Sequence, residues 1–208
     1  MSKETRSPFK IRNVKDSTGW YSSDYLSLAR DAIESLAELE AVTEEVKQNW
    51  PLPLGETIRE PRLYPEIKVL AARRDRLSMA TLIFSAMAVE AFLNYYGVLR
   101  IGEAAYTKHF ERRLSMVEKL SVLLLVCDGI AISGNDELLV SIRTLTNVRN
   151  SVVHPKTKEM DSYVPGELRD GLPVPDAARE AVKSMKQFFI DFVRAVPDAE
   201  HMLPERSH

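Results

Sequence analysis

Three side chains near residue 150 could act together on a phosphodiester. Arg149, Asn150 and His154 stand at the end of a predicted helix, in the run Arg-Asn-Ser-Val-Val-His. Arginine is always charged, and its planar fork of donors matches two phosphate oxygens. Histidine titrates near neutral pH, so it can remove or supply a proton. The residue types and their spacing therefore fit chemistry on a phosphodiester.

The helix that carries Arg149 is predicted over residues 136–153. Asn135 can cap its first turn, and Pro155 stops it. At about 100° per residue, Arg149 falls on the same side as four apolar positions, which are Leu138, Ile142, Leu145 and Val152. A charge on such a stripe needs a carboxylate, an anionic ligand or a solvated cleft at a subunit seam, because an unpaired buried charge costs several kcal/mol.

His154 would lie about 140° from Arg149 if the helix stayed regular. The residue before a proline avoids the α conformation, however, so we expect the backbone at His154 to leave the helix. That departure can bring the imidazole back beside the guanidinium. Alternatively, two copies of the run meet across a two-fold axis, and each chain contributes to both sites.

The helical period dominates the chain and predicts an all-α fold, an antiparallel bundle of about five helices. After possible caps at Ser22 and Ser23, apolar residues advance in steps of three and four from Leu26 to Val46. Further helices are predicted over residues 66–100, 115–126, 136–153 and 176–196, with a shorter one over 103–113. The helix over 66–100 is apolar on nearly every face in its middle, as expected of a central helix.

Proline and glycine divide the chain into three predicted parts. Residues 1–65 form an N-terminal helix and a proline-rich linker packed on the bundle, and residues 66–196 form the bundle itself. Within the bundle, Asp128 and Gly129 break the third helix, and Asp176 caps the last one. Residues 197–208 are expected to form a flexible tail.

The charge balance excludes a global basic field. The chain has 28 Lys and Arg against 30 Asp and Glu, a net charge of -2, so any contact with nucleic acid must come from a local patch. Lys156 and Lys158 follow His154 directly, and Arg143 lies on the Arg149 helix. We expect these three side chains to extend the phosphate-binding rim.

The single cysteine, Cys127, excludes an intramolecular disulfide and fits a reducing compartment. It ends an apolar run, so we expect it to be a small buried side chain. The first residues contain no apolar leader, and no apolar run reaches the roughly 18 residues of a membrane span. We therefore expect a cytoplasmic protein that makes no contact with a membrane.

Other enzyme classes find no support in the sequence. There is no glycine-rich phosphate loop before a Lys-Ser/Thr pair, no Gly-x-Ser-x-Gly elbow and no His-Glu-x-x-His. The four histidines and one cysteine are too scattered for a zinc site. We expect neither a metal nor a cofactor.

The run from Arg149 to His154, with a polar residue directly after the arginine, resembles the Arg-x4-6-His motif of the HEPN superfamily (higher eukaryotes and prokaryotes nucleotide-binding domain). The segment from Ala86 to Asn94 is similar to the central helix of several such domains. The resemblance covers about residues 70–192, and the first helix and its linker look like an extension. It implies a homodimeric, metal-independent endoribonuclease that cleaves RNA, often a toxin or an antiphage-defence effector with an antitoxin or other regulatory protein as partner. Other members of the superfamily have lost activity.

The chemistry implied by the resemblance is transesterification, in which a ribose 2'-oxygen attacks the adjacent phosphorus. His154 would perform the proton steps, Arg149 would bind the phosphate oxygens, and Asn150 would position the phosphate or the histidine. Glu90 would support Arg149 from the central helix.

Three alternatives stay open. Arg149 and Glu90 could form only a buried structural ion pair, although Glu90 could also orient Arg149 for catalysis. His154 could only cap the carbonyl groups at a helix C-terminus. The whole protein could be a non-catalytic helical dimer that binds a protein, a nucleotide or RNA.

Overall fold

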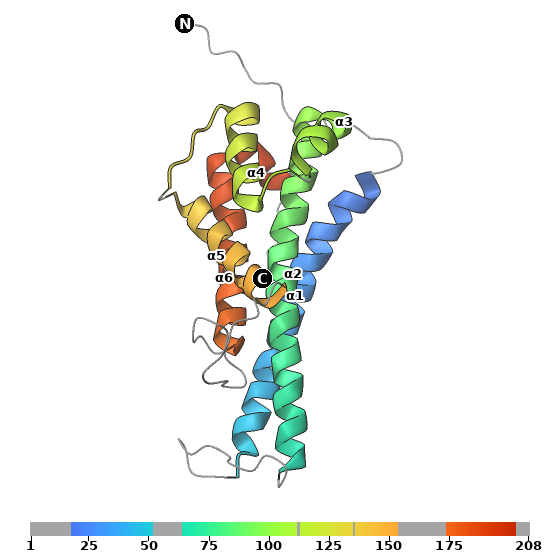
Figure 1. Cartoon of the computed structure of the whole chain (residues 1–208), viewed down its shortest axis with the longest axis vertical. Coiled ribbons are helices and arrows are strands. Elements are labelled where there is room, and N and C mark those ends of the chain that lie inside the picture. The colour runs from blue at the N-terminus through green and yellow to red at the C-terminus, as the bar shows by residue number, and fades with distance from the viewer. Residues whose placement is uncertain (1–17, 52–63, 112, 135, 154–173, 203–208) are drawn as a thin grey trace, which may run out of the picture.

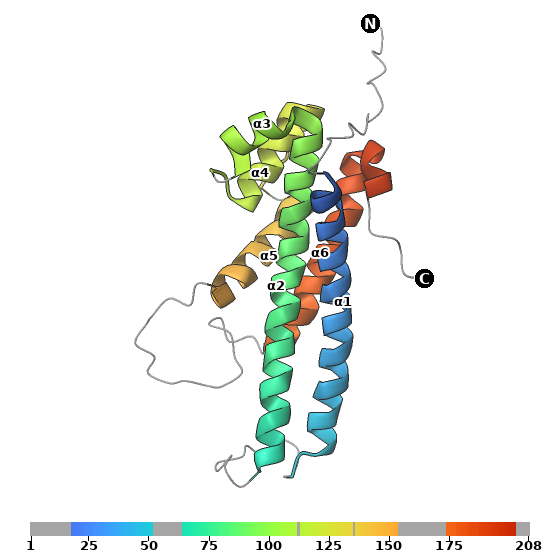
Figure 2. The same ribbon diagram turned by 90° about the vertical axis from the view of Figure 1, so that its right-hand side faces the viewer.

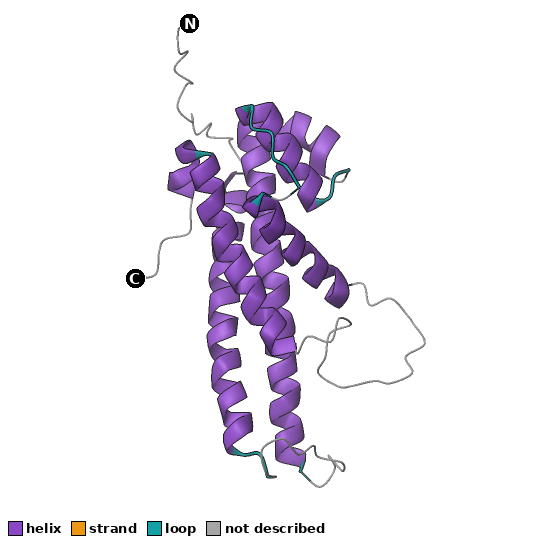
Figure 3. Cartoon of the chain, turned by 90° about the vertical axis from the view of Figure 1, so that its left-hand side faces the viewer, coloured by secondary structure: helices purple, strands orange, loops and turns teal. Residues whose placement is uncertain are grey.

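The computed structural model describes residues 18–51, 64–111, 113–134, 136–153 and 174–202, and no strand occurs among them (Figure 3). Six α-helices make up most of these residues, which confirms the predicted all-α bundle. They are α1 (Thr18–Gln48), α2 (Pro65–Ile101), α3 (Glu103–Tyr106), α4 (Met116–Leu123), α5 (Glu137–Val153) and α6 (Val174–Ala195). Two π-helical turns, Thr107–Glu111 and Leu124–Asp128, extend α3 and α4.

Helix α2 is the centre of the fold. It runs antiparallel to α1, contacts α6 and α5, and meets α3 and α4 near its C-terminal end (Figures 1 and 2). At the opposite end, the α1 and α2 pair extends well beyond α5 and α6. Most of the buried side chains of α2 are apolar, and several of them are small, such as Ser85, Ala86 and Ala88, which suits a helix packed on several sides.

The largely aliphatic core contains an aromatic cluster around Phe92 of α2, which is fully buried. The ring of Phe92 meets Phe192 of α6 edge-on, with centroids 4.8 Å apart, and meets Tyr25 of α1 edge-on at 5.4 Å. Edge-to-face pairs of this kind are favourable because the positive rim of one ring faces the negative face of the other. The cluster therefore fastens α1, α2 and α6 together.

Helix α2 is also the one described helix that is long and apolar enough, by length and composition, to cross a membrane. Half of its most apolar window is buried inside the protein. The apolar character of that window thus serves the contacts with the other helices, as it does in the core helix of a bundle.

Two predicted helix starts are wrong. Helix α1 begins at Thr18, so Ser22 and Ser23 lie inside its first turns and are not caps. Helix α6 begins at Val174, before the predicted cap Asp176. Pro175 is tolerated there because the N–H groups of a first turn have no partner within the helix.

The prediction of a flexible tail from residue 197 is also wrong for its first part. Residues Pro197–Met202 form a 3₁₀-helix in which Ala199 and Met202 are buried. The Tyr25 hydroxyl donates a hydrogen bond to the Met202 carbonyl oxygen at 2.8 Å. This contact between distant parts of the chain holds the segment against α1, and local sequence patterns do not reveal it.

Candidate functional site

Helices α2 and α5 bring Glu90 and Arg149 together. One guanidinium nitrogen of Arg149 lies 3.9 Å from Oε2 of Glu90, and both side chains are about one-third exposed, at 34% and 31%. Three of the four apolar positions predicted to share a side with Arg149 are buried, namely Leu138, Ile142 and Leu145. Burial of these residues fixes the rotation of α5 about its axis, and Arg149 lies on the same side of the helix, where it is partly exposed to solvent.

The guanidinium of Arg149 keeps its hydrogen-bonding capacity. At 3.9 Å its contact with Glu90 is an ion pair that is longer than a hydrogen bond. Within the ranges that the structure describes, Arg149 makes no hydrogen bond. Its planar fork can therefore donate to a ligand without first losing a hydrogen bond to any part of the chain that the structure describes.

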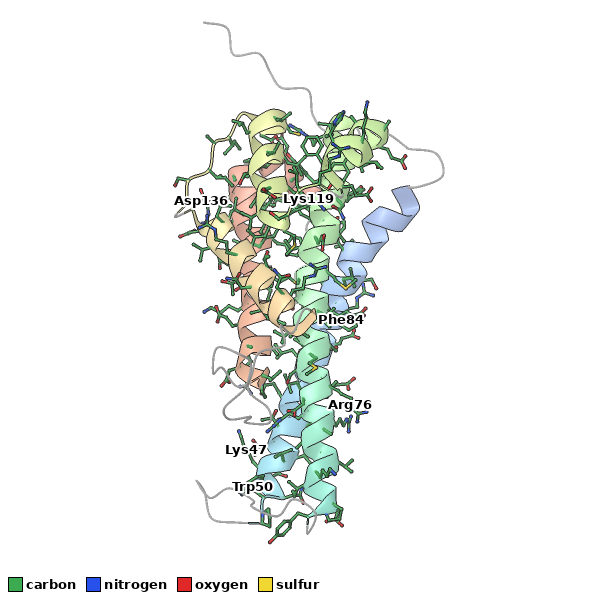
Figure 4. The ribbon with its side chains drawn as sticks, viewed as in Figure 1. Lys47, Trp50, Arg76, Phe84, Lys119 and Asp136 are labelled. Atoms are coloured by element: carbon green, nitrogen blue, oxygen red, sulfur yellow. The ribbon has the colours of Figure 1, made fainter. Side chains whose placement is uncertain are left out.

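Lys119 of α4 approaches the same carboxylate from the protein interior. Its Nζ atom lies 3.7 Å from Oε1 of Glu90, and its side chain is only 2% exposed. The ammonium also donates a hydrogen bond to Oδ1 of Asn94 at 2.9 Å. Figure 4 shows Lys119 where α4 faces α2. Glu90 therefore contacts two cations, the buried Lys119 and Arg149, which is about one-third exposed.

The electrostatics of Lys119 follow from this burial. Loss of water around the ammonium lowers the pKa of Lys119 below the ordinary 10.5, and the repulsion from Arg149 lowers it further. The carboxylates of Glu90 and Glu111 act in the opposite direction and raise the pKa. The proton on Lys119 is thus coupled to the charges of Glu90 and Arg149.

Tyr106 of α3 contacts the same oxygen of Asn94 as Lys119 does. The Tyr106 hydroxyl donates a hydrogen bond to Oδ1 of Asn94 at 2.6 Å. The tyrosine ring can lie this close to α2 because Gly97 carries no side chain; a Cβ atom at Gly97 would be 2.3 Å from the ring. Gly97 therefore leaves the space that Tyr106 needs to reach Asn94.

Helix α4 is fixed at its N-terminus by a complete capping box. The Glu118 backbone N–H donates to Oγ of Ser115, and the Ser115 backbone N–H donates to the Glu118 carboxylate at 2.8 Å. This reciprocal pair, which the sequence predicts, sets where α4 begins. The residues on its inner face are Met116, Lys119, Leu120 and Leu123.

The remaining predicted site residues fall in three groups. Asn150 is exposed, directly after Arg149. Arg143 donates a hydrogen bond to the Gly134 carbonyl oxygen at 2.6 Å, and it lies about 120° around α5 from Arg149, so the structure does not bring it to the rim beside Glu90. His154, Lys156 and Lys158 lie outside the described residues.

Sequence reasoning missed Lys119 and Asn94, although both leave a signal. Lys119 lies three residues after Met116 and four before Leu123, so it is a charge on an apolar stripe. Asn94 lies one helical turn after Glu90, on an otherwise apolar central helix. When two apolar helix faces are known to pack together, a polar residue on each face predicts a contact between those two polar side chains.

A second polar cluster closes the π-helical end of α4. Asp128, with its side chain 4% exposed, accepts a hydrogen bond from Arg100 at 2.6 Å and another from the Tyr96 hydroxyl. Arg100 also donates to the carbonyl oxygen of Cys127 at 2.6 Å. Cys127 itself is half-buried, and this burial raises the pKa of its thiol. The cluster connects the end of α4 to α2, and each carboxylate oxygen of Asp128 accepts a hydrogen bond.

A surface pocket lies elsewhere, between the ends of α1 and α2. It is lined by Glu45, Asn49, Tyr64, Ile67 and Leu70, among others. Leu70 is 20 residues before Glu90, which places the pocket about 30 Å away along α2. This pocket is thus separate from the Glu90 and Arg149 site.

Comparison of the chain with known protein families, with curated proteins and with solved structures gives no match. Over the described residues, no group of three or more His, Cys, Asp or Glu side chains is placed to hold a metal ion. The feature of the molecule that bears on its function is therefore the geometry of the cluster that Glu90, Asn94, Lys119 and Arg149 form.

Proposed function

We propose that the protein is a HEPN-like, metal-independent endoribonuclease that cleaves RNA with Arg149 and His154, as a homodimer in the cytoplasm. The observation that carries the proposal is the state of Arg149. Its guanidinium sits at the end of α5, one-third exposed, beside a carboxylate and without a hydrogen bond among the described residues. An arginine in that state is prepared to bind a phosphate group.

A purely structural role explains this arrangement less well. Ion pairs between partly exposed side chains contribute about 0–1 kcal/mol to stability. The contact between Arg149 and Glu90, at 3.9 Å and about one-third exposed on each side, belongs to this class. Stability alone therefore gives little reason for an arginine at the end of an apolar stripe, whereas binding of an anion gives one.

The charge of the cluster supports the same function. Arg149 and Lys119 carry two positive charges against the one negative charge of Glu90. When Lys119 is protonated, these three side chains together have a charge of about +1, which favours an anion. The excess is local, since the whole chain is slightly acidic.

The proposed reaction is a balanced phosphoryl transfer. The 2'-oxygen of a ribose forms a bond to the adjacent phosphorus, and the bond from phosphorus to the 5'-oxygen of the next nucleotide breaks. A base removes the proton of the 2'-hydroxyl, and an acid protonates the leaving 5'-oxygen. We assign these proton steps to His154, in one or both subunits, because an imidazole can do both near neutral pH.

Arg149 would stabilise the charge that develops on the non-bridging phosphate oxygens. Asn150, exposed beside it, would hold the phosphate or the imidazole. A cyclic phosphate on one fragment and a 5'-hydroxyl on the other are the expected products.

The homodimer is supported by the surface of α2 next to the site. Met79 and Met87 are exposed, at 44% and 41%, and Ile83 between them is half-buried. At about 100° per residue these three side chains lie within about 80° of one another, on the face that carries Glu90. Pairing of this face with a second copy would bury apolar surface and bring two Arg149 sites close together.

The test is an assay on a mixed pool of RNA with the purified protein in EDTA. We expect cleavage in the presence of the chelator, with fragment masses that correspond to cyclic phosphate or 3'-phosphate ends. Fragments with 5'-phosphates, or a strict need for magnesium, would contradict the mechanism.

Light scattering at micromolar concentration tests the dimer, and a monomer would contradict a composite site. Wild-type protein that never cuts RNA would instead support the non-catalytic alternative, a helical dimer that binds a protein, a nucleotide or RNA.

A further inference from the structure

The buried cation beside the site has no role in the reaction described above. Lys119 is 2% exposed, so its ammonium cannot touch a phosphate on the surface. Burial of a charged lysine is costly, and such groups are rare in proteins unless they are paired. Its partners are Oε1 of Glu90 and Oδ1 of Asn94, and both belong to the inner side of the cluster.

The two oxygens of Glu90 face different cations. Oε1 faces Lys119 at 3.7 Å, and Oε2 faces Arg149 at 3.9 Å. The carboxylate carries one negative charge, which these two contacts share. Without Lys119, no cation would hold Oε1 of Glu90 on the inner side, and the carboxylate would be free to close on Arg149 and cancel most of its attraction for an anion.

We propose that Lys119 is a positioning residue of the Arg149 site, which holds Glu90 from the interior and so leaves the guanidinium free to bind a phosphodiester. The inference rests on the proposed function, because it concerns the anion that the site would take. It adds a residue of α4 to a site otherwise built from α2 and α5.

The scaffold around Lys119 fits this role. Asn94 accepts hydrogen bonds from both Lys119 and Tyr106, which fixes the direction of the amide and of the ammonium. The ring of Tyr106 is held against α2 over Gly97. Lys119 is thus fixed by its hydrogen bond to Asn94, while its contact with Glu90 is longer and electrostatic.

The role should give anion binding a particular pH dependence. The charged groups that act on Lys119 are Glu90 on α2, Arg149 on α5 and Glu111 on the π-helical turn after α3. The pKa of Lys119 is lowered from 10.5, chiefly by burial. As the pH rises through that pKa, the ammonium loses its proton, Glu90 acts on Arg149 alone, and the affinity for an anion should fall.

The test is binding of a fluorescent single-stranded DNA oligonucleotide, measured by anisotropy at low salt. This probe has phosphodiesters but no 2'-hydroxyl, so it cannot be cleaved by the proposed reaction. The proteins are the wild type, Lys119→Met, Glu90→Gln and the double variant. Thermal melting of each variant checks that it is folded.

We expect Lys119→Met to weaken binding at pH 7 about tenfold, within the range typical of coupling between two sites. In the Glu90→Gln background the same substitution should change binding less than twofold, because no carboxylate is left for Lys119 to hold. Equal losses in both backgrounds would show that Lys119 acts independently of Glu90, through its own charge or through the fold, and would overturn the inference. An unchanged affinity in both backgrounds would overturn it as well.

A second measurement needs no variant of Lys119 and remains informative if Lys119→Met fails to fold. Wild-type affinity for the probe should decrease as the pH rises towards 10.5, and Glu90→Gln should remove this decrease. The same pH dependence in both proteins would overturn the inference. If the wild type binds the probe no better than Arg149→Gln does, the proposed function itself is contradicted. The other outcomes concern only the role of Lys119.

Discussion

Substitution of Gly97 by alanine should destabilise the protein, although alanine is the better helix former. Gly97 lies in the last turns of α2, a helix of 37 residues. In an unobstructed helix interior, replacing glycine with alanine stabilises by roughly 0.5–1 kcal/mol. Here the new Cβ atom would lie 2.3 Å from Cε2 and 2.4 Å from Cδ2 of Tyr106. Carbon atoms in contact normally stay about 3.5–4.0 Å apart.

The ring of Tyr106 has little room to move away. It is 1% exposed, and it stacks on Phe110 with centroids 5.8 Å apart and planes 7° apart. Overpacking of this kind costs about 1–3 kcal/mol. Displacement of the ring would also stretch the hydrogen bond to Asn94, which contributes about 1 kcal/mol. We expect a net loss of about 2 kcal/mol, or roughly 4–8 °C in melting temperature for a chain of this length.

The assay is urea and thermal unfolding followed by circular dichroism. Gly134→Ala is a matched control, because the nearest atom to its new Cβ is a nitrogen of Arg143 at 4.0 Å; we expect a change within about 0.5 kcal/mol. In a Tyr106→Ala background the obstruction is gone, so Gly97→Ala should become neutral or stabilising. A stability loss that persists in that background would refute the reasoning.

Two further stability predictions follow from the buried charges. Lys119→Met should leave the free energy of unfolding at pH 7 within about 1 kcal/mol of the wild type or raise it. The desolvation cost of the buried ammonium disappears, and its partners are not left unpaired: Glu90 is about one-third exposed and still faces Arg149, and Asn94 still accepts a hydrogen bond from Tyr106. The pKa of Lys119 is lowered in the folded state, so between that pKa and 10.5 the unfolded state binds more protons and the stability of the wild type rises with pH. Urea unfolding from pH 7 to 10 should therefore show that the stability of Lys119→Met relative to the wild type decreases as the pH rises. An increase in this stability difference would contradict the assignment. Asp128→Asn should lower the free energy of unfolding by about 2–4 kcal/mol because it breaks the buried pair with Arg100. Glu137→Gln removes an exposed pair with Arg194 and should lower it by less than about 1 kcal/mol. Equal losses would contradict the claim that burial makes the Asp128 pair the more important one.

The sequence predicts the helices well because each one follows its own period. The apolar steps of α5 place Leu138, Ile142 and Leu145 in the core, and the same rotation places Arg149 towards the central helix. The sequence also indicates Glu90 as a partner for Arg149, because it is a carboxylate on an otherwise apolar helix. The two residues do meet, although the sequence could not specify that each side chain would be about one-third exposed or that their charged atoms would lie 3.9 Å apart.

The rest of the cluster depends on how helices distant in the sequence pack. Lys119 reaches Glu90 only because α4 folds back on the end of α2, with Tyr106 and Gly97 in close contact beside it. No local pattern encodes that return. The 3₁₀-helix at Pro197–Met202 is similar, since its hydrogen bond joins residues 177 positions apart. Long-range packing therefore limits what can be read from the chain alone.

The central claim is that Arg149 and His154 cleave RNA, and comparison of three variants on one RNA pool in EDTA tests it most directly. His154→Ala should reduce cleavage by about 10² to 10⁴ with a melting temperature within a few degrees of the wild type. Arg149→Gln should reduce cleavage by a similar factor, because it removes the charge that stabilises the phosphate. Arg30→Gln, which changes an exposed arginine on α1, should cleave like the wild type. Cleavage that survives in His154→Ala and Arg149→Gln, or wild-type protein that cuts no RNA, would contradict the account.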